Sequence, residues 1–304
     1  SQATEQQQLT AQAAWRPHRH VTVHRAIVAA RPLPCRGRSL RLCQNMTMTY
    51  QYLLLEYDGP FATITLNQPE KRNALTACLM QELTDALQVI AKGQALGVIL
   101  AANGPVFSAG HSFGDMAGAS PAQLHALFEI CATMMNTVQA MPQPVVARVH
   151  ALATAAGCQL VATCDMALAA DTASFAMPGG KGGMFCHTPL VAVARNIGRK
   201  RALEMAMTGD AIDAATAADW GLINRVVPAA QLQAATLELL QRATRGSFGS
   251  KALGKQVYYQ QIDLPQQQAY AAASQAMAEA ALSPDAQEAF AAFLGKREVR
   301  YRPR

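Results

Sequence analysis

The chain has 304 residues, of which 51% are hydrophobic, so it can bury one large core without disulfides or metal ions and is not a disordered polypeptide. The formal net charge of +6 comes from residues 1–48, which contain seven Arg and a single acidic residue, Glu5. The other 19 basic and 19 acidic residues cancel. The body of the chain is therefore neutral. Because it has no basic stripe and few aromatic residues, we predict no nucleic-acid partner.

Residues 1–48 form a basic tail that we do not expect to be part of the fold. The tail is rich in Gln and then in Arg, has no sustained apolar period, and ends at Asn45-Met46-Thr47-Met48. Two interpretations stay open: an extension ahead of the true start, which the two Met residues favour, or a transit peptide, which the Arg-rich, acid-poor composition favours. We predict a disordered tail at 1–48, an α/β core at 49–245 and a C-terminal helical region at 246–304.

Cysteine content and hydropathy indicate in which cellular compartment the protein is expected. The seven cysteines are an odd number with no C-x-x-C pair and no His at zinc-ligand spacing, which indicates reduced thiols and no metal site. We therefore predict a cytoplasmic protein, or a mitochondrial one if the tail is a transit peptide. No apolar run approaches the roughly 18 residues of a membrane span, so no membrane association is expected.

The first part of the body predicts a hairpin followed by two long helices. The runs 52–57 and 61–66 are β-rich and flank the turn triplet Asp58-Gly59-Pro60. Thr76 is a suitable N-cap for a helix whose apolar residues recur at helical spacing, namely Leu79, Leu83, Leu87 and Ile90. A short buried strand at 97–101 follows. Ser120 and Pro121 then begin a helix that ends near Ala140.

The second part alternates strand and helix before becoming entirely helical. We predict a strand at 144–149, a helix of small residues at 156–163 and a strand at 166–170. This alternation predicts an α/β domain with parallel pairing and right-handed crossovers. From about residue 229 the strand signals fade, and the remaining helices include one that is capped at Ser283 and runs to about Lys296.

Two loop-to-helix junctions place small residues where the chain must turn sharply. They are the segments 107–115 (FSAGHSFGD) and 150–160 (HALATAAGCQL). Each can direct backbone N–H groups from a helix N-terminus at a negative oxygen, and together they would form an oxyanion hole for a thioester enolate. Taken alone, either segment is better explained as an ordinary tight turn that packs small residues.

Taken in order, a series of motifs resembles the crotonase (enoyl-CoA hydratase/isomerase) superfamily. The motifs are NAL at 73–75, FSAGH at 107–111, ATAAGCQL at 153–160, CDMALA at 164–169 and SFAMPG at 174–179. The resemblance covers about residues 50–300, and the 153–160 run is most similar to the enoyl-CoA hydratase domain-containing protein 3 group. It implies an α/β fold, a crotonase-type spiral of ββα units with a C-terminal helical trimerisation region.

The resemblance also implies a substrate and a site. The backbone N–H groups of His111 and Ala156 match the two oxyanion donors. Residues matching the CoA and acyl site are Lys71, Arg72, Ala74, Ala109, Ser112, Phe113, Gly114 and Gly157. The substrate would be an acyl-CoA, with coenzyme A bound as part of that substrate and no permanently bound cofactor. Members of the superfamily form trimers or dimers of trimers, so a homotrimer or dimer of trimers is expected.

Gln159 and Gly179 occupy the positions where hydratases of this superfamily carry their two glutamates. A hydratase needs groups that orient a water, take its proton and protonate the α-carbon. A Gln side chain can only hydrogen-bond near neutral pH, and Gly has no side chain. Losing a general acid or base typically lowers the rate by about 10² to 10⁴. Efficient hydration by the usual route is therefore not expected, although a hole made of backbone would remain.

Replacement chemistry has two candidates. By spacing, Cys186 and His187 fall near the nucleophilic Asp of the superfamily's dehalogenases, so this pair could act as base or nucleophile. We favour the alternative that His187 caps or packs before the helix at Pro189. For His111, we favour a role of the backbone N–H, with the imidazole along the pocket wall, over proton transfer. Asp165, between a helix and a strand, is expected to be structural.

The leading functional hypothesis is an enoyl-CoA hydratase-like enzyme of acyl-CoA metabolism that stabilises a thioester enolate. Its reaction would then be one of the superfamily's others: decarboxylation, isomerisation or thioester hydrolysis. The alternative is a catalytically inactive acyl-CoA-binding protein, which the missing glutamates favour. RNA binding is a third hypothesis, since some crotonase relatives bind RNA, but only the tail is basic.

Overall fold

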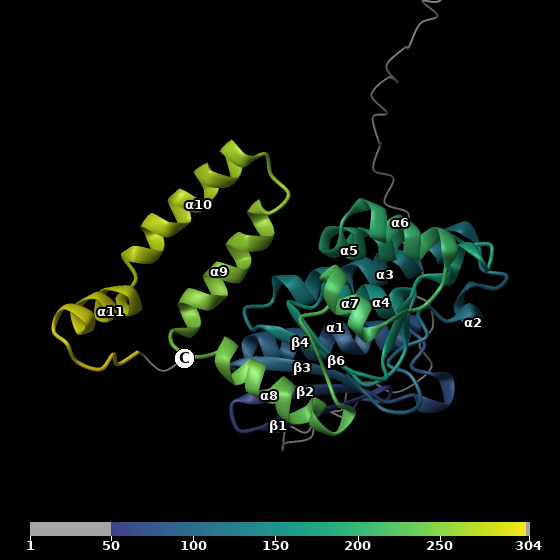
Figure 1. Ribbon diagram of the computed structural model, residues 1–304, viewed down its shortest axis with the longest axis horizontal. Coiled ribbons are helices and arrows are strands. Elements are labelled where there is room, and N and C mark those ends of the chain that lie inside the picture. Colours follow the sequence, from purple (N-terminus) through teal and green to yellow (C-terminus); the bar gives the residue numbers. More distant parts are fainter. Residues whose placement is uncertain (1–49, 302–304) are drawn as a thin grey trace, which may run out of the picture. The chain divides into compact units, whose positions relative to one another are not determined.

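The structure is a computed structural model that describes residues 50–301, and the predictions for the basic tail lie outside these residues. Figure 1 shows the described chain coloured along the sequence, from the purple N-terminal strands to the yellow C-terminal helices. The predicted boundary at 245/246 falls in the loop between two helices, α8 (Leu232–Ala243) and α9 (Phe248–Gln261).

A six-stranded sheet forms the centre of the core, in the order β1-β2-β3-β4-β6-β9. β1 pairs antiparallel with β2, which confirms the predicted hairpin, and all other neighbours are parallel. The strands are β1 (Leu53–Asp58), β2 (Phe61–Leu66), β3 (Gly97–Ala102), β4 (Val145–Val149), β6 (Met166–Ala170) and β9 (Arg225–Val227). Parallel neighbours need helical crossovers, which the next elements supply.

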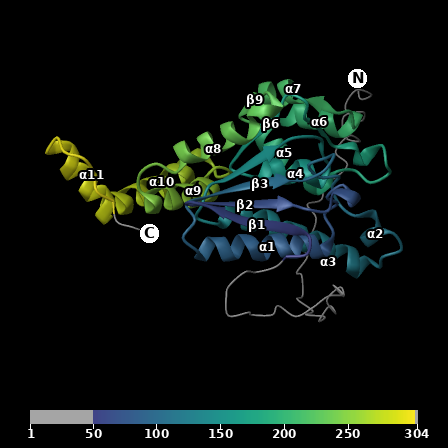
Figure 2. The ribbon, with the colours of Figure 1, turned by 90° about the horizontal axis from the view of Figure 1, so that it is seen from below.

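Helices cover both faces of this sheet, as Figure 2 shows with α1 and α8 on opposite sides. On one face lie α1 (Ala77–Lys92) and α3 (Pro121–Ala140), and the four apolar residues predicted for the first of them are all buried. Thr76 caps α1, and Ser120 caps α3 in a reciprocal capping box with Gln123, as the sequence predicted. On the other face, α8 buries Leu232 and Leu240 against β3, β4 and β6.

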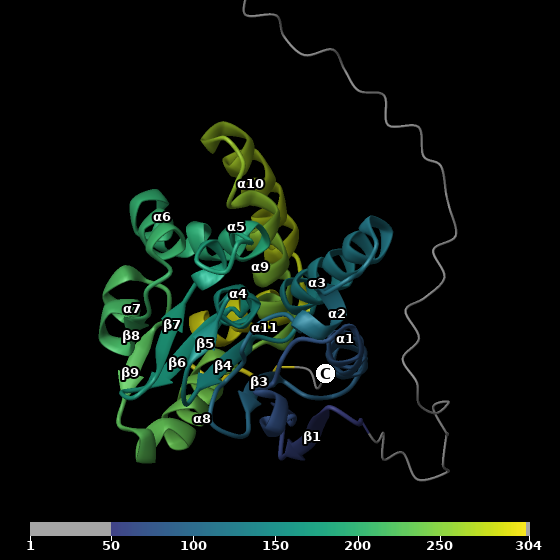
Figure 3. The same cartoon turned by 90° about the vertical axis from the view of Figure 1, so that its right-hand side faces the viewer.

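A second, three-stranded sheet lies beside the first and was not predicted. It consists of β5 (Ala153–Thr154), β7 (Ser174–Ala176) and β8 (Ile212–Asp213), in that order. It carries the helix α4 (Ala156–Thr163), whose bounds match the prediction and whose eight residues are all buried. α5 (His187–Ile197) packs against α4 and in turn contacts α6 (Arg199–Thr208), whereas α7 (Ala214–Trp220) packs against β7, β8 and β9 (Figure 3).

The C-terminal part is helical, as predicted, and consists of α9, α10 (Gln266–Ala281) and α11 (Pro284–Leu294), which contact one another. The helix capped at Ser283 ends at Leu294, two residues before the predicted Lys296. α9 joins the core through Lys255, whose ammonium lies 2.7 Å from the Asp165 carboxylate, with both side chains largely buried. Asp165 also accepts hydrogen bonds from Tyr259 and the Val145 N–H, which confirms its structural role.

The cysteines within residues 50–301 correct a further expectation. Cys131, Cys158, Cys164 and Cys186 are free thiols, whereas Cys78 is disulfide-bonded, which contradicts the expectation of reduced thiols throughout. No helix in this range is long and apolar enough to cross a membrane, and no group of three or more His, Cys, Asp or Glu residues there could hold a metal ion.

Candidate functional site

The first wall of the site is the loop 68–76, which Asn73 holds in shape. Arg72 and Asn73 both have positive φ, 53° and 49°, in the region where Asn is among the better tolerated residues. The fully buried Asn73 amide accepts from the Gln68 N–H at 2.9 Å and donates to the Asn103 and Val106 carbonyls at 2.7 and 3.1 Å. The loop is thereby fixed, while the Lys71 and Arg72 side chains stay exposed.

The segment 107–112 lies directly beside this loop. The Ala109 N–H donates to the Arg72 carbonyl at 3.0 Å, and the Leu75 N–H donates to the Gly110 carbonyl at 2.7 Å. Leu75 and His111 thus form a parallel β-bridge in which Leu75 supplies both bonding groups. In such a bridge the N–H of the opposite residue, here His111, points away from its partner. The backbone N–H of His111 is therefore not used in the bonding between the loop 68–76 and the segment 107–112.

His111 does not stand at a helix N-terminus, which corrects one sequence expectation. The next helix, α2 (Phe113–Met116), begins two residues later and is only four residues long, with no side-chain cap from Ser112. A helix that short adds little dipole. A helix does follow the loop, but it begins after His111, since the small residues at 107–115 show only that the chain turns there and not how long the next helix is.

The N-terminus of α4 closes the site on the other side. The Thr154 N–H donates to the Ser108 carbonyl at 3.0 Å, which aligns segments 107–111 and 152–156. Ala155 is the N-cap of α4, so Ala156 is the first helical residue, as predicted. A Cβ added at Gly110, which has a φ of 82°, would lie 3.1 Å from the Ala156 nitrogen. The backbone just before His111 therefore approaches the Ala156 N–H closely, and only Gly fits between them.

Gly157, a predicted substrate-binding residue, lies where α4 packs closely on the segment 107–111. A Cβ there would stand 2.5 Å from the Ser108 carbonyl oxygen, closer than real Cβ contacts come. The small residue is therefore required by the close packing of α4 on the segment 107–111.

A half-buried His111 ring and a buried Gln159 side chain lie close to the proposed backbone donors. The His111 ring packs edge-on against Phe128 of α3, with 5.3 Å between ring centroids, and burial lowers the pKa of this imidazole below its usual 6.5. Gln159 is 5% exposed and follows Ala156 by one helical turn. Neither nitrogen of His111 nor the Gln159 Oε1 has a hydrogen-bond partner within residues 50–301.

At Gly179 the chain leaves no space for a side chain. A Cβ at this position would lie 2.2 Å from the Met184 carbonyl oxygen and 2.7 Å from the Cys186 Sγ. The loop closes on itself because the Met184 N–H donates to the Gly179 carbonyl at 2.9 Å. A side chain at position 179, where the resemblance implies a hydratase glutamate, would therefore meet the chain's own backbone and a thiol.

The residues Cys186 and His187 do not form a hydrogen-bonded pair within the described range. Cys186 is buried, and burial raises the pKa of its thiol, which disfavours the nucleophilic thiolate. His187 is the exposed first residue of α5 and contacts the Phe185 ring edge-on at 5.3 Å. This geometry agrees with the packing alternative for His187.

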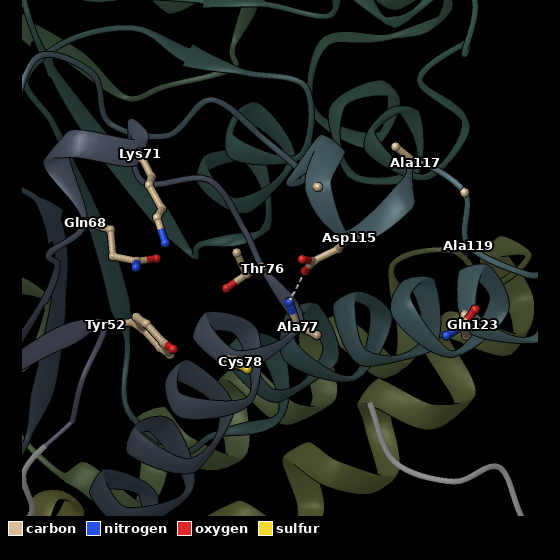
Figure 4. A pocket seen from close by; sticks show the side chains of 12 residues that line it. Tyr52, Gln68, Lys71, Thr76, Ala77, Cys78, Asp115, Ala117, Ala119 and Gln123 are labelled. Atoms are coloured by element: carbon tan, nitrogen blue, oxygen red, sulfur yellow. Dashed lines mark hydrogen bonds between the residues drawn. The ribbon is translucent and has the colours of Figure 1, made fainter. Parts of the chain in front are cut away.

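A cavity of about 450 Å³ opens beside the loop 68–76 (Figure 4). Of the predicted substrate-binding residues, Lys71 and Gly114 line it, whereas Phe113 of α2 is 79% exposed. Gln68 and Asp115 also line it and were not predicted; the Asp115 carboxylate accepts from the Ala77 N–H at 2.9 Å. No sequence signal marked these two residues, because their roles depend on how α2 folds back toward the start of α1.

The core sheet, the helices on its two faces and the helical C-terminal part make up a crotonase-type fold, and solved structures of the enoyl-CoA hydratase/isomerase family share it. Residues 57–304 match the enoyl-CoA hydratase/isomerase family, and the chain belongs to this family.

Among its relatives is the mouse enoyl-CoA hydratase domain-containing protein 3, mitochondrial, which is 43% identical over 245 residues covering 80% of this chain and 81% of that protein. The crystal structure of human enoyl Coenzyme A hydratase domain-containing protein 3 superposes with a TM-score of 0.79 at 39% identity, covering 83% of this chain and all of that one. An enoyl-CoA hydratase from Mycobacterium smegmatis gives 0.80 at 40% identity, with 83% and 99% covered. The predicted likeness to the domain-containing protein 3 group is confirmed.

Proposed function

We propose that this protein binds an acyl-CoA and stabilises the enolate of its thioester between the N–H groups of His111 and Ala156. The observation that carries the proposal is the hydrogen-bonded alignment of segments 72–75, 107–112 and 152–156, which brings the chain at Gly110 to the Ala156 nitrogen. Members of the family act on acyl-CoA thioesters, and backbone donors aimed at a developing oxyanion are commonly the largest single contribution to such catalysis.

The coenzyme A portion would lie along the loop 68–76. The exposed Lys71 and Arg72 side chains suit its phosphates, because both are cationic and not engaged in any ion pair among residues 50–301. Ala74, Ala109 and the segment Ser112 to Gly114 would border the pantetheine and acyl portions. Coenzyme A enters and leaves as part of the substrate, and no permanent cofactor is part of the proposal.

Hydration is not the reaction we propose. Gln159 stands where a carboxylate would be needed and cannot exchange a proton near neutral pH. At Gly179 the chain itself fills the space of the second carboxylate. A reaction that uses the same oxyanion hole without both glutamates fits these residues better: isomerisation or decarboxylation through the enolate, or thioester hydrolysis through a tetrahedral oxyanion.

A non-catalytic acyl-CoA-binding protein is the second candidate. The observation that favours it is the state of the replacement groups, since burial holds the Cys186 pKa above its usual value and His187 makes no hydrogen bond with it. Binding needs only the loop and the backbone donors, which do not depend on these side chains.

The test combines calorimetry with mass spectrometry on the full chain and a panel that contains crotonyl-CoA, butyryl-CoA and methylmalonyl-CoA. Binding with a product other than the hydrated thioester would support the enzyme and name its reaction, while binding without any product would support the second candidate. Ala156→Pro removes one donor at a helix position that tolerates Pro, and should lower turnover about 10²- to 10³-fold. Unchanged turnover in this variant, or hydration by the natural chain at an ordinary enzymatic rate, would refute the mechanism.

Assembly and compartment are further parts of the proposal. Large apolar side chains of α10 and α11 are exposed, among them Tyr270, Met277 and Phe293 at 68%, 75% and 83%, which supports a homotrimer or dimer of trimers built through these helices. Light scattering on the purified chain would measure its mass. For the compartment, the four free thiols within residues 50–301 support a cytoplasmic protein and the disulfide at Cys78 counts against it, while the names of the relatives support a mitochondrial one. Comparing the location of the full chain with that of a chain starting at Met48 decides between them.

A further inference from the structure

The hydroxyl of Ser108 joins two parts of the candidate site. This residue is fully buried, and its hydroxyl donates to the Asn73 carbonyl at 2.8 Å and accepts from the Gly110 N–H at 3.2 Å. The first bond ties the segment 107–112 to the loop 68–76, and the second closes a turn within the segment, as Ser hydroxyls commonly do. Among residues 50–301, the hydroxyl is the only hydrogen-bond partner of both backbone groups.

This turn orients the first proposed oxyanion donor. The Gly110 carbonyl and the His111 N–H belong to one peptide group, and in a trans peptide the two point in opposite directions. The Gly110 carbonyl accepts from the Leu75 N–H at 2.7 Å, so the His111 N–H points away from Leu75. Gly110 is thus held at both ends, by Ser108 at its nitrogen and by Leu75 at its carbonyl. Its φ of 82° lies in the left-handed region that Gly enters freely, so these two bonds are what fix it.

Ser108 also contacts the helix that supplies the second proposed donor. Its carbonyl accepts from the Thr154 N–H at 3.0 Å, two residues before Ala156. A Cβ at Gly157 would lie 2.5 Å from the carbonyl oxygen of Ser108 and 2.9 Å from its Oγ, so the first turn of α4 rests directly on this residue. A single buried residue therefore contacts the loop 68–76, the turn before His111 and the start of α4.

We propose that Ser108 is the positioning residue of the oxyanion hole, whose hydroxyl holds the His111 N–H in the direction that the thioester oxygen requires. The inference rests on the proposed acyl-CoA site and adds to it a residue that acts only through the backbone of its neighbours. Without the hydroxyl, the Asn73 carbonyl and the Gly110 N–H are buried and unpaired, and the peptide group between Gly110 and His111 is released on one side.

The test compares dissociation constants for butyryl-CoA and for S-butyl-CoA, the thioether that lacks the carbonyl oxygen, by calorimetry on the full chain. Both compounds carry the same coenzyme A and the same alkyl chain, so the ratio of the two constants reports the donors alone. The natural chain should bind butyryl-CoA about tenfold more tightly, the effect of about one net hydrogen bond.

Ser108→Ala should reduce this preference to about one and change the affinity for S-butyl-CoA by less than about twofold. The second expectation follows because the amide of Asn73 still holds the loop 68–76 through its own three hydrogen bonds. Should Ser108→Ala not fold, Ser108→Cys carries the same test, since a thiol is only a weak donor and acceptor in place of the hydroxyl.

Thr236→Val is the matched control. It removes another fully buried hydroxyl, which donates to the Leu232 carbonyl at 2.7 Å within α8, on the other face of the sheet. This variant should also lower the Tm but should keep the preference for the thioester. Loss of the preference in Thr236→Val, or its retention in Ser108→Ala or Ser108→Cys, would overturn the inference and leave the proposed site standing. A natural chain that binds neither compound, or both equally, would instead overturn the proposed function and the inference with it.

Discussion

Adding one methyl group at Gly179 is expected to destabilise the protein, because its space is already taken. The Cβ of Gly179→Ala would lie 2.2 Å from the Met184 carbonyl oxygen, 2.7 Å from the Cys186 Sγ and 3.2 Å from the Cys186 nitrogen. Two of these atoms are backbone, so the loop itself must move. Such overpacking typically lowers the free energy of unfolding by about 1–3 kcal/mol. For a core of this size, each kcal/mol corresponds to about 2–4 °C in Tm.

Thermal unfolding followed by circular dichroism measures this effect, with Gly182→Ala as the matched control. An added Cβ at Gly182 meets nothing closer than the Gly179 carbonyl oxygen at 3.6 Å, an ordinary contact in the same loop. The control should therefore unfold within about 2 °C of the natural chain, since surface substitutions usually change stability by less than about 0.5 kcal/mol. If Gly179→Ala were as stable as Gly182→Ala, the argument that the loop fills this position would be wrong.

The same reasoning extends to attempts at restoring a hydratase. Gln159→Glu keeps the size of the side chain, so it should fold normally. Adding Gly179→Glu should then produce a less stable protein that hydrates crotonyl-CoA no faster than Gln159→Glu alone, because the second carboxylate cannot occupy its place. A double variant that hydrates faster than the single one by about 10² or more, the contribution of one general acid or base, would refute this.

Three further predictions concern stability. Lys255→Met leaves the Asp165 carboxylate buried without its cation and should lower the free energy of unfolding by about 3–5 kcal/mol in urea titrations; the double variant that also carries Asp165→Asn should recover part of the loss. Burial lowers the pKa of His111 below its usual 6.5, so between the two pKa values the unfolded chain binds a proton that the folded chain does not. The stability that the neutral, buried His111 contributes is therefore present above pH 6.5 and is lost as the pH falls toward the pKa of the folded chain. His111→Phe should therefore lose less stability than the natural chain between pH 7.5 and 5.5 in the same titrations. Ala155 has φ 50° and ψ −120°, a backbone region that favours Gly. Ala155→Gly should therefore raise the free energy of unfolding, measured in urea, by about 1 kcal/mol. A free energy of unfolding equal to or below that of the natural chain would show that this backbone is not strained.

Local signals determined how much of the fold was predictable. The caps Thr76, Ser120 and Ser283 placed three helix starts correctly, because an N-cap acts through bonds within its own first turn. The small-residue helix 156–163 was also correct at both ends. The sheet β5-β7-β8 was missed, since its strands are two or three residues long and pair residues as far apart in sequence as Ser174 and Asp213, where no periodicity can show.

The candidate site was predictable where it consists of backbone and not where it depends on loop packing. Gly110 and Gly157 signal close approach through their residue type alone, and both approaches are present. The sequence also marked Gly179 as a missing carboxylate, but it contains no signal that Met184 and Cys186 would fill the space. The exposure of His187 could not be predicted for the same reason, because it depends on how the loop 179–186 leads into α5.

The two replaced glutamate positions are therefore physically different, and this bears on what the protein does. Gly179 is closed by backbone, whereas Gln159 remains a buried polar group whose amide oxygen has no partner among the described residues. A site that had only lost its chemistry would be free to fill with apolar side chains, because an unpartnered buried oxygen costs about 1–3 kcal/mol. Ala155, directly before the Ala156 donor, adds a conformation that costs a similar amount. We therefore expect a ligand to contact this helical turn, in agreement with the proposed acyl-CoA site.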